Sequence, residues 1–277
     1  MTAHDPPVAR PALRGGALAV LLLIGAVGGT LSGLFGVGGG IIMVPLLMIW
    51  AGRDQRQAST ASLVAILPTS VAGASGYLAG GHVAVLPAAV IAVGAIAGTL
   101  IGSWLLSRIH LTALEWMFIG LLVITAVRMA VFGSNETGDA PEGWLVQVGY
   151  LALGLLMGVA SGLFGIGGGA IAVPALVGAF GFADLLAKGT SLLTMIPTSV
   201  VGTVSNVRRG MVNVRDGLVV GLAATAFSFL GVALAFLIPA RLSGLLFGLF
   251  LLGTALQLAI KAIRKARVRP DIAPVES

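Results

Sequence analysis

The sequence predicts an all-α polytopic membrane protein built from two inverted repeats, each a glycine-broken helical hairpin plus three transmembrane helices. Composition and segment lengths predict the membrane class. The 277 residues are 57% hydrophobic and only 9% charged, with a mean hydropathy of +1.06, whereas soluble domains carry about 25% charged residues. Uncharged apolar runs recur, each close to or above the ~20 residues that span a bilayer. They cover 15–52, 58–81, 83–107, 217–240 and 242–260.

The repeats are visible as a duplication with an offset of 129 residues. The stretch SGLFGVGGGIIMVP at 32–45 returns as SGLFGIGGGAIAVP at 161–174, with 11 of 14 positions identical. The same offset relates PTSVAG at 68–73 to PTSVVG at 197–202. Between the halves, the polar and acidic segment GSNETGDAPEG is typical of a linker. The predicted organisation is a cytoplasmic tail at 1–14, repeat 1 at 15–132, an external linker at 133–143, repeat 2 at 144–262, and a basic cytoplasmic tail at 263–277.

Each half opens with a glycine-rich segment where a membrane helix is expected. Glycine weakens a helix, and a backbone released from a helix inside a bilayer has no water to satisfy it. The segment forms either a hairpin, near 17–35 and 38–50 in the first half, or one broken crossing. Hairpins invert the second repeat and place 13 of the 16 lysine and arginine residues on the side of both termini, against at best 11 for broken crossings. The positive-inside rule therefore favours inverted repeats with cytoplasmic termini.

Two copies of a GLFGxGGG…xVP stretch, each followed by PTS, resemble the sulfite exporter TauE/SafE family of membrane permeases. The resemblance extends from about Gly16 to Ile263. It implies a secondary transporter in the inner (plasma) membrane, with export as the implied direction. The implied partners are membrane lipid and a small anionic substrate such as sulfite or an organosulfonate.

The interrupted segments also predict an anion-binding site. Helices that begin at the breaks would present free N–H groups and positive dipole ends inside the membrane, and paired interruptions mark the central site of many transporters. Ser62 and Thr69 share a helix face, and Pro68 frees a backbone carbonyl beside them. The predicted substrate-binding residues are Gly38, Gly39, Gly40, Ser62, Thr69 and Ser70 with their equivalents Gly167, Gly168, Gly169, Ser191, Thr198 and Ser199.

A purely structural role is the alternative for each of these sets. Serine and threonine in membrane helices commonly donate to their own backbone, so the two interpretations of the hydroxyls stay open. Small residues four apart allow close helix packing. We expect packing to be the role of Gly25, Gly29, Gly33, Gly154, Gly158 and Gly162.

Charged and reactive residues are sparse in the apolar runs. The chain has no cysteine, which excludes disulfide and thiolate chemistry. No acid–base pair or metal cluster is recognisable, so we predict no enzyme activity and no cofactor. The basic residues fit membrane topology better than nucleic-acid binding. The predicted interfacial anchors are Lys188, Arg128, Asp216, Glu115 and His110.

An anion would then be held by backbone dipoles and hydroxyls, without a fixed cation. A coupling proton or ion is compatible with this site, although no mid-membrane titrating side chain is expected to carry it. An anion channel of the same fold and a non-transporting membrane scaffold are the alternative functions. The oligomeric state is left open.

Overall fold

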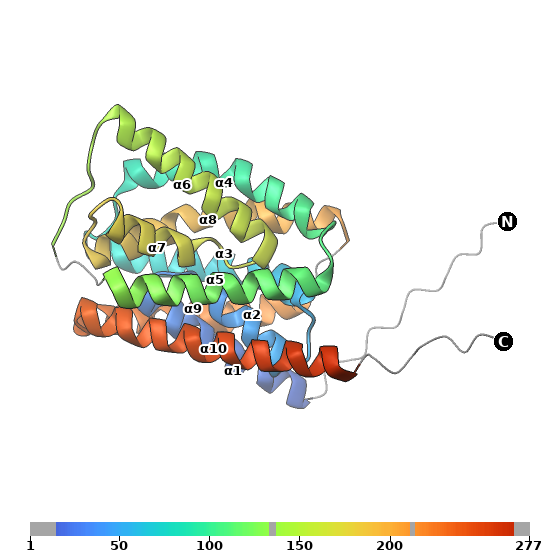
Figure 1. Ribbon diagram of the computed structural model, residues 1–277. Coiled ribbons are helices and arrows are strands. Elements are labelled where there is room, and N and C mark those ends of the chain that lie inside the picture. The colour runs from blue at the N-terminus through green and yellow to red at the C-terminus, as the bar shows by residue number, and fades with distance from the viewer. Residues whose placement is uncertain (1–14, 133–136, 211–213, 269–277) are drawn as a thin grey trace, which may run out of the picture.

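The computed structural model describes residues 15–132, 137–210 and 214–268, and its regular structure within these ranges is entirely α-helical (Figure 1). Two short helices, α2 (Gly40–Ile49) and α7 (Gly169–Gly178), lie among eight helices that are long and apolar enough to cross a membrane. The all-α membrane class is confirmed. The long helices are α1 (Gly15–Phe35), α3 (Gln55–Ala79), α4 (Val85–Leu106), α5 (Leu111–Phe132), α6 (Trp144–Phe164), α8 (Asp184–Arg208), α9 (Val214–Leu237) and α10 (Ala240–Val268).

Helices α1 and α2 form a hairpin, as do α6 and α7. Trp50, which follows α2, lines one pocket with Gly16 and Val20 at the start of α1. The short helix therefore returns to the end from which α1 departs. In the second half, the ring of Phe180, after α7, lies 4.7 Å from that of Tyr150 near the start of α6. The predicted hairpins are confirmed, because a broken crossing would place these residues at opposite ends of the bundle.

The bundle has two ends, which we call end A, where α1 begins and α10 finishes, and end B, where residues 137–143 precede α6 (Figure 1). At end A, Lys261 of α10 donates to the carbonyl of Met48 in α2 over 2.6 Å. At end B, the Ala183 N–H donates to the carbonyl of Gly138 over 3.0 Å. The first hairpin therefore enters from end A and the second from end B. This opposite entry supports inverted repeats, whose relation by a two-fold axis in the membrane plane stays a prediction.

Glycines let helices of one half pack directly on helices of the other. Helix α1 runs along α9, where a Cβ atom at Gly29 would overlap the carbonyl oxygen of Ala224. Helix α6 runs along α4 in the same way, and a Cβ at Gly158 would overlap the carbonyl oxygen of Ala95. The packing role predicted for this glycine series is confirmed. The two halves are therefore interlocked, since each hairpin packs on a helix of the other repeat.

We expect Gly29→Ala and Gly158→Ala each to lower the free energy of unfolding by about 1–3 kcal/mol, because the added methyl group must displace a neighbouring backbone. Thermal unfolding in detergent measures the change. Gly253→Ala in α10 is the matched control, since nothing lies within 4 Å of its added methyl. The control should be neutral or slightly stabilising. Equal behaviour of all three variants would contradict direct backbone packing.

Candidate functional site

Each hairpin turns at a glycine-rich tip inside the bundle. We call residues 36–39 the first tip and residues 165–168 the second tip, and every residue of both is buried. The predicted breaks at the glycine-rich segments are confirmed, because α1 ends at Phe35 and α2 begins at Gly40, while α6 ends at Phe164 and α7 begins at Gly169. Six glycines in the two tips have φ between +68° and +91°, a region that side chains disfavour. They are Gly36, Gly38, Gly39, Gly165, Gly167 and Gly168.

The backbones of the two tips touch each other. A Cβ atom at Gly40 would lie 2.6 Å from the Cα of Ile166. In the reciprocal contact, a Cβ at Gly169 would lie 2.6 Å from the Cα of Val37. The absence of side chains at these glycines is therefore what allows the tips to meet.

Met195 of α8 fills the space beside both tips. Its methyl group lies where a side chain at Gly38 or Gly167 would have to go. Ile66 of α3, 129 residues earlier, also lies against both of these glycines. The junction of the tips is thus closed by one branched and one flexible apolar side chain at equivalent positions.

The first N–H groups after each tip have no backbone partner. Ile42 and Met43 both donate to the carbonyl of Gly39, and no described carbonyl accepts from Gly38 or Gly40. The second tip repeats this pattern, with Ile171 and Ala172 both donating to the Gly168 carbonyl. No side chain caps either short helix. Unsatisfied N–H groups and the positive dipole ends of α2 and α7 therefore converge on the centre of the bundle.

Ser62 and Ser191 occupy equivalent positions but differ in their contacts. The hydroxyl of Ser62 in α3 lies within hydrogen-bonding distance of the carbonyl of Gly165, so it secures the second tip. Ser191 in α8 is 0% exposed, and its hydroxyl has no hydrogen-bond partner among the described residues. An unpaired buried hydroxyl costs about 1–3 kcal/mol. Ser191 is therefore the predicted hydroxyl that is free to meet a ligand.

The other four predicted hydroxyls donate to carbonyls of their own helices. They lie just after Pro68 and Pro197, and each has its partner three or four residues earlier. A ligand would have to compete with these carbonyls. The donors are Thr69 to Ala65 (2.7 Å), Ser70 to Leu67 (3.0 Å), Thr198 to Met195 (2.9 Å) and Ser199 to Ile196 (2.9 Å).

A pocket of about 220 Å³ opens at end A between α5, α10 and the segment that joins α2 to α3. Its lining includes Arg53, Glu115 and Lys261, together with Gln55 at the start of α3. Gln55 is fully buried, and its Nε2 donates to the hydroxyl of Ser59 over 3.3 Å. The carbonyl of Ser59 in turn contacts Gly165. The pocket is therefore connected to the second tip through one turn of α3.

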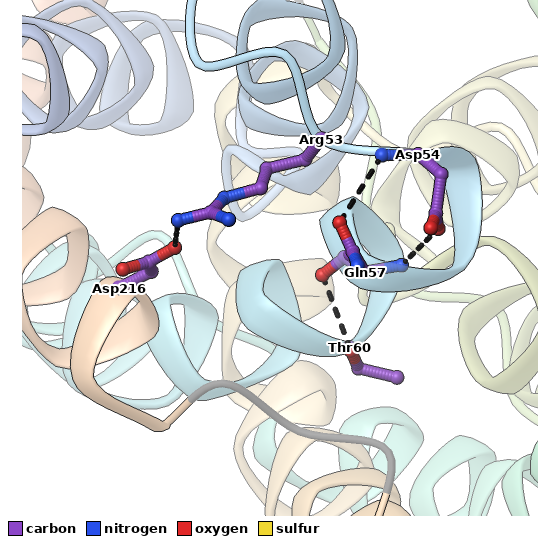
Figure 2. Close-up of polar contacts among 5 residues, drawn as sticks. All are labelled: Arg53, Asp54, Gln57, Thr60 and Asp216. Atoms are coloured by element: carbon purple, nitrogen blue, oxygen red, sulfur yellow. Dashed lines mark hydrogen bonds and ion pairs between the residues drawn. The ribbon is translucent and has the colours of Figure 1, made fainter. Parts of the chain in front are cut away.

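Polar contacts fix the segment that borders this pocket (Figure 2). Arg53 forms an ion pair of 2.5 Å with Asp216 at the start of α9. The carboxylate of Asp54 accepts from the Gln57 N–H over 2.8 Å, and the Gln57 side chain accepts from the Asp54 N–H over 3.4 Å. Thr60 donates to the carbonyl of Gln57 in the next turn. This capping box fixes the start of α3, and with it the position of Gln55.

Three of the predicted interfacial anchors are buried inside the protein. They are Glu115, which is 8% exposed and lines the end A pocket, Lys188 and Asp216. Lys188 is 1% exposed, and its ammonium group lies 2.5 Å from Asp184 and 2.9 Å from the hydroxyl of Ser243. Asp216 is 2% exposed and pairs with Arg53. The prediction was wrong for Lys188 and Asp216 because both lie on helix faces that pack against neighbours, where an ion pair replaces hydration.

The expectation that the site works without a fixed cation stays a prediction, but a buried lysine packs beside the first tip. Gly36 of the first tip packs directly on the backbone and side chain of Lys188. A comparison of the two repeats in the sequence could have identified Lys188. At the offset of 129, Asp184 and Lys188 stand where the first half has Gln55 and Ser59. A charged pair that replaces a neutral pair within an otherwise similar repeat marks a position where the two halves differ in charge.

Comparisons with known proteins agree with this architecture. The family model described as sulfite exporter TauE/SafE matches residues 4–129 and 150–275. The chain belongs to the TauE/SafE family. A relative from Haemophilus influenzae, named as a probable membrane transporter protein, is 28% identical over 259 residues, which are 87% of this chain and 97% of the relative.

Two further relatives carry similar names. The probable membrane transporter protein YunE of Bacillus subtilis is 27% identical over 218 residues, or 70% of this chain and 80% of YunE. A probable membrane transporter protein of Xylella fastidiosa is 32% identical over 203 residues, or 71% of this chain and 76% of its own length. The TauE/SafE assignment and these names support a transporter with a small-molecule substrate.

We expect Ser62→Ala to lower the free energy of unfolding by about 1–3 kcal/mol, because the buried carbonyl of Gly165 loses its donor. Ser191→Ala removes a hydroxyl that has no partner and should leave stability unchanged or raise it. Thermal unfolding of the ligand-free protein compares the two equivalent positions. A similar loss in both variants would show that the hydroxyl of Ser191 is already engaged.

Proposed function

We propose that this TauE/SafE protein is a secondary transporter that exports a small sulfur-containing oxyanion, such as sulfite or an organosulfonate, across the inner (plasma) membrane. The observation that carries the proposal is the meeting of the two tips at the centre of the bundle. Two short helices point their positive ends at this junction, and their first N–H groups lack backbone partners. Such helix starts bind anions, and the family description supplies the sulfur oxyanion class.

The anion site comprises the glycines at the two helix starts, Gly38–Gly40 and Gly167–Gly169, together with the hydroxyl of Ser191. Met195 occupies the junction, so its side chain must move when an anion enters. Methionine is unbranched and rotates easily, which suits a residue that alternates between filling and vacating a site. Thr69 and Thr198 contribute less than Ser191, because each must give up a carbonyl of its own helix. Ser70 and Ser199 are satisfied in the same way.

Access to the site alternates between the two ends of the bundle. In this conformation the end A pocket reaches Gln55, one turn from the residues that contact the second tip. End A also carries most of the described basic residues, including Arg53, Arg56, Arg108 and Lys261, and the positive-inside rule therefore makes it cytoplasmic. Because α1 begins and α10 finishes at end A, both termini are cytoplasmic in this proposal. A pocket that opens toward the cytoplasm fits loading for export.

Transport by the purified protein tests the proposal. Proteoliposomes should take up sulfite with saturation, and sulfite inside the vesicles should accelerate uptake by exchange. A panel of sulfite, sulfoacetate, taurine, thiosulfate and sulfate, scored by thermal stabilisation, identifies the preferred anion. A current that rises linearly with voltage and does not saturate would support the channel. Absence of both flux and stabilisation with every anion would contradict the proposed substrate class.

We expect Ser191→Ala to weaken sulfite binding at least about tenfold, since a hydrogen bond to a charged group contributes about 1.5–3 kcal/mol. Thr69→Val and Thr198→Val should each weaken binding less than about tenfold, because their hydroxyls already have partners. Sulfite-dependent thermal stabilisation of the purified variants gives the affinities. Gly29→Ala is the control, with lowered stability and unchanged affinity. If Ser191→Ala binds normally while the threonine variants do not, the anion lies beside the prolines instead.

A further inference from the structure

Lys188 forms a buried polar cluster near end B with Asp184 and Ser243. The lysine lies one turn into α8, and its ammonium group bridges Asp184 of the same helix and Ser243 of α10. All three residues are at most 4% exposed. The cluster therefore places a buried ion pair between α8 and α10.

The first tip rests on this cluster. A Cβ at Gly36 would lie 2.5 Å from the Cα of Lys188 and 2.6 Å from its Cγ. Phe35, just before the tip, stacks on Phe247 of α10 with ring centroids 4.6 Å apart. The unpartnered hydroxyl of Ser191 lies one turn further along α8. Lys188 is thus a buried cation between the first tip and end B.

The equivalent position in the first half, Ser59, contacts the second tip and carries no charge. There Ser59 packs on Gly165 as Lys188 packs on Gly36, and Gln55 donates to Ser59. Gln55 also lines the open pocket at end A. A neutral pair therefore suffices to hold a tip. The charge of Lys188 serves another purpose than packing.

We infer that Lys188 is the cationic partner of the transported oxyanion, and that the anion and Asp184 compete for its ammonium group. This inference rests on the proposed function. When end B is closed, Lys188 is neutralised by Asp184 and held to Ser243. When an oxyanion reaches the first tip, its oxygens take the place of the Asp184 carboxylate, and the link from Lys188 to α10 is released.

Charge balance makes the two partners mutually exclusive. A buried ammonium group needs one paired anion, because an uncompensated charge in the protein interior is strongly unfavourable. Asp184 lies in the first turn of α8, where the positive end of the helix dipole stabilises its carboxylate without Lys188. Breaking the ion pair therefore costs less free energy for the Asp184 carboxylate than an unpaired state would cost for the Lys188 ammonium group. Anion occupancy is in this way coupled to the contact that closes end B.

A charge-neutral double variant, Lys188→Met with Asp184→Asn, tests the inference. It removes both charges together, so it avoids leaving one of them buried and unpaired. We expect it to fold with thermal stability near that of the wild type and to bind sulfite at least about tenfold more weakly. Asp184→Asn alone frees the ammonium group from its competitor and should strengthen sulfite binding. Lys188→Arg, which keeps the charge, should retain binding.

Arg241→Gln is the matched control, because this exposed residue lies two positions from Ser243 at the same end. Its sulfite affinity should match that of the wild type. Sulfite-dependent thermal stabilisation at constant ionic strength gives all the affinities. If the wild type binds sulfite and the double variant binds it equally well, Lys188 is a structural ion pair and the inference is overturned while the proposed function stands. If the wild type binds no anion of the panel, the proposed function itself is overturned, and the inference falls with it.

Discussion

The structure depends on one constraint, which is that backbone released from a helix inside a bilayer must be covered by protein. Both tips break their helices at depth, and neither could face lipid with its N–H groups unpaired. They are therefore buried against each other and against Ile66 and Met195. The close pairing of α1 with α9 and of α6 with α4 follows from the same need. Glycine supplies both the turns and the tight helix contacts that bring the tips together.

The features that the sequence predicted well are properties of the backbone. A run of glycines breaks a helix in any surroundings, and glycines four apart favour close packing, so the helix breaks and the role of Gly29 could be inferred from spacing alone. The distribution of lysine and arginine residues distinguished hairpins from broken crossings. This distribution depends only on which loops lie on the same side of the membrane. These inferences need no knowledge of which helix lies next to which.

The predictions that failed or stayed open concern side chains, whose roles depend on the helix that each one faces. Lys188 lies near the start of α8, and position along the helix indicated an interface. Its burial arises because the first tip and α10 cover that face. The hydroxyls of Thr69 and Thr198 show the same limit. Their spacing is compatible with a site or with bonds to their own helices, and the structure shows the latter bonds.

In the alternating-access mechanism that we propose, the differences between the halves decide which end of the bundle is closed. If the repeats were identical, the conformation with one end open and its mirror with the other end open would have equal free energy. This equality is broken at the two positions that contact the tips. The second tip lies against a neutral pair, Gln55 and Ser59, whereas the first tip lies against a charged pair, Asp184 and Lys188. A difference of about 1.4 kcal/mol changes the ratio of two states tenfold. In this proposal one buried ion pair and its bond to Ser243 hold end B closed, and an anion that competes for Lys188 removes that bias only where it binds.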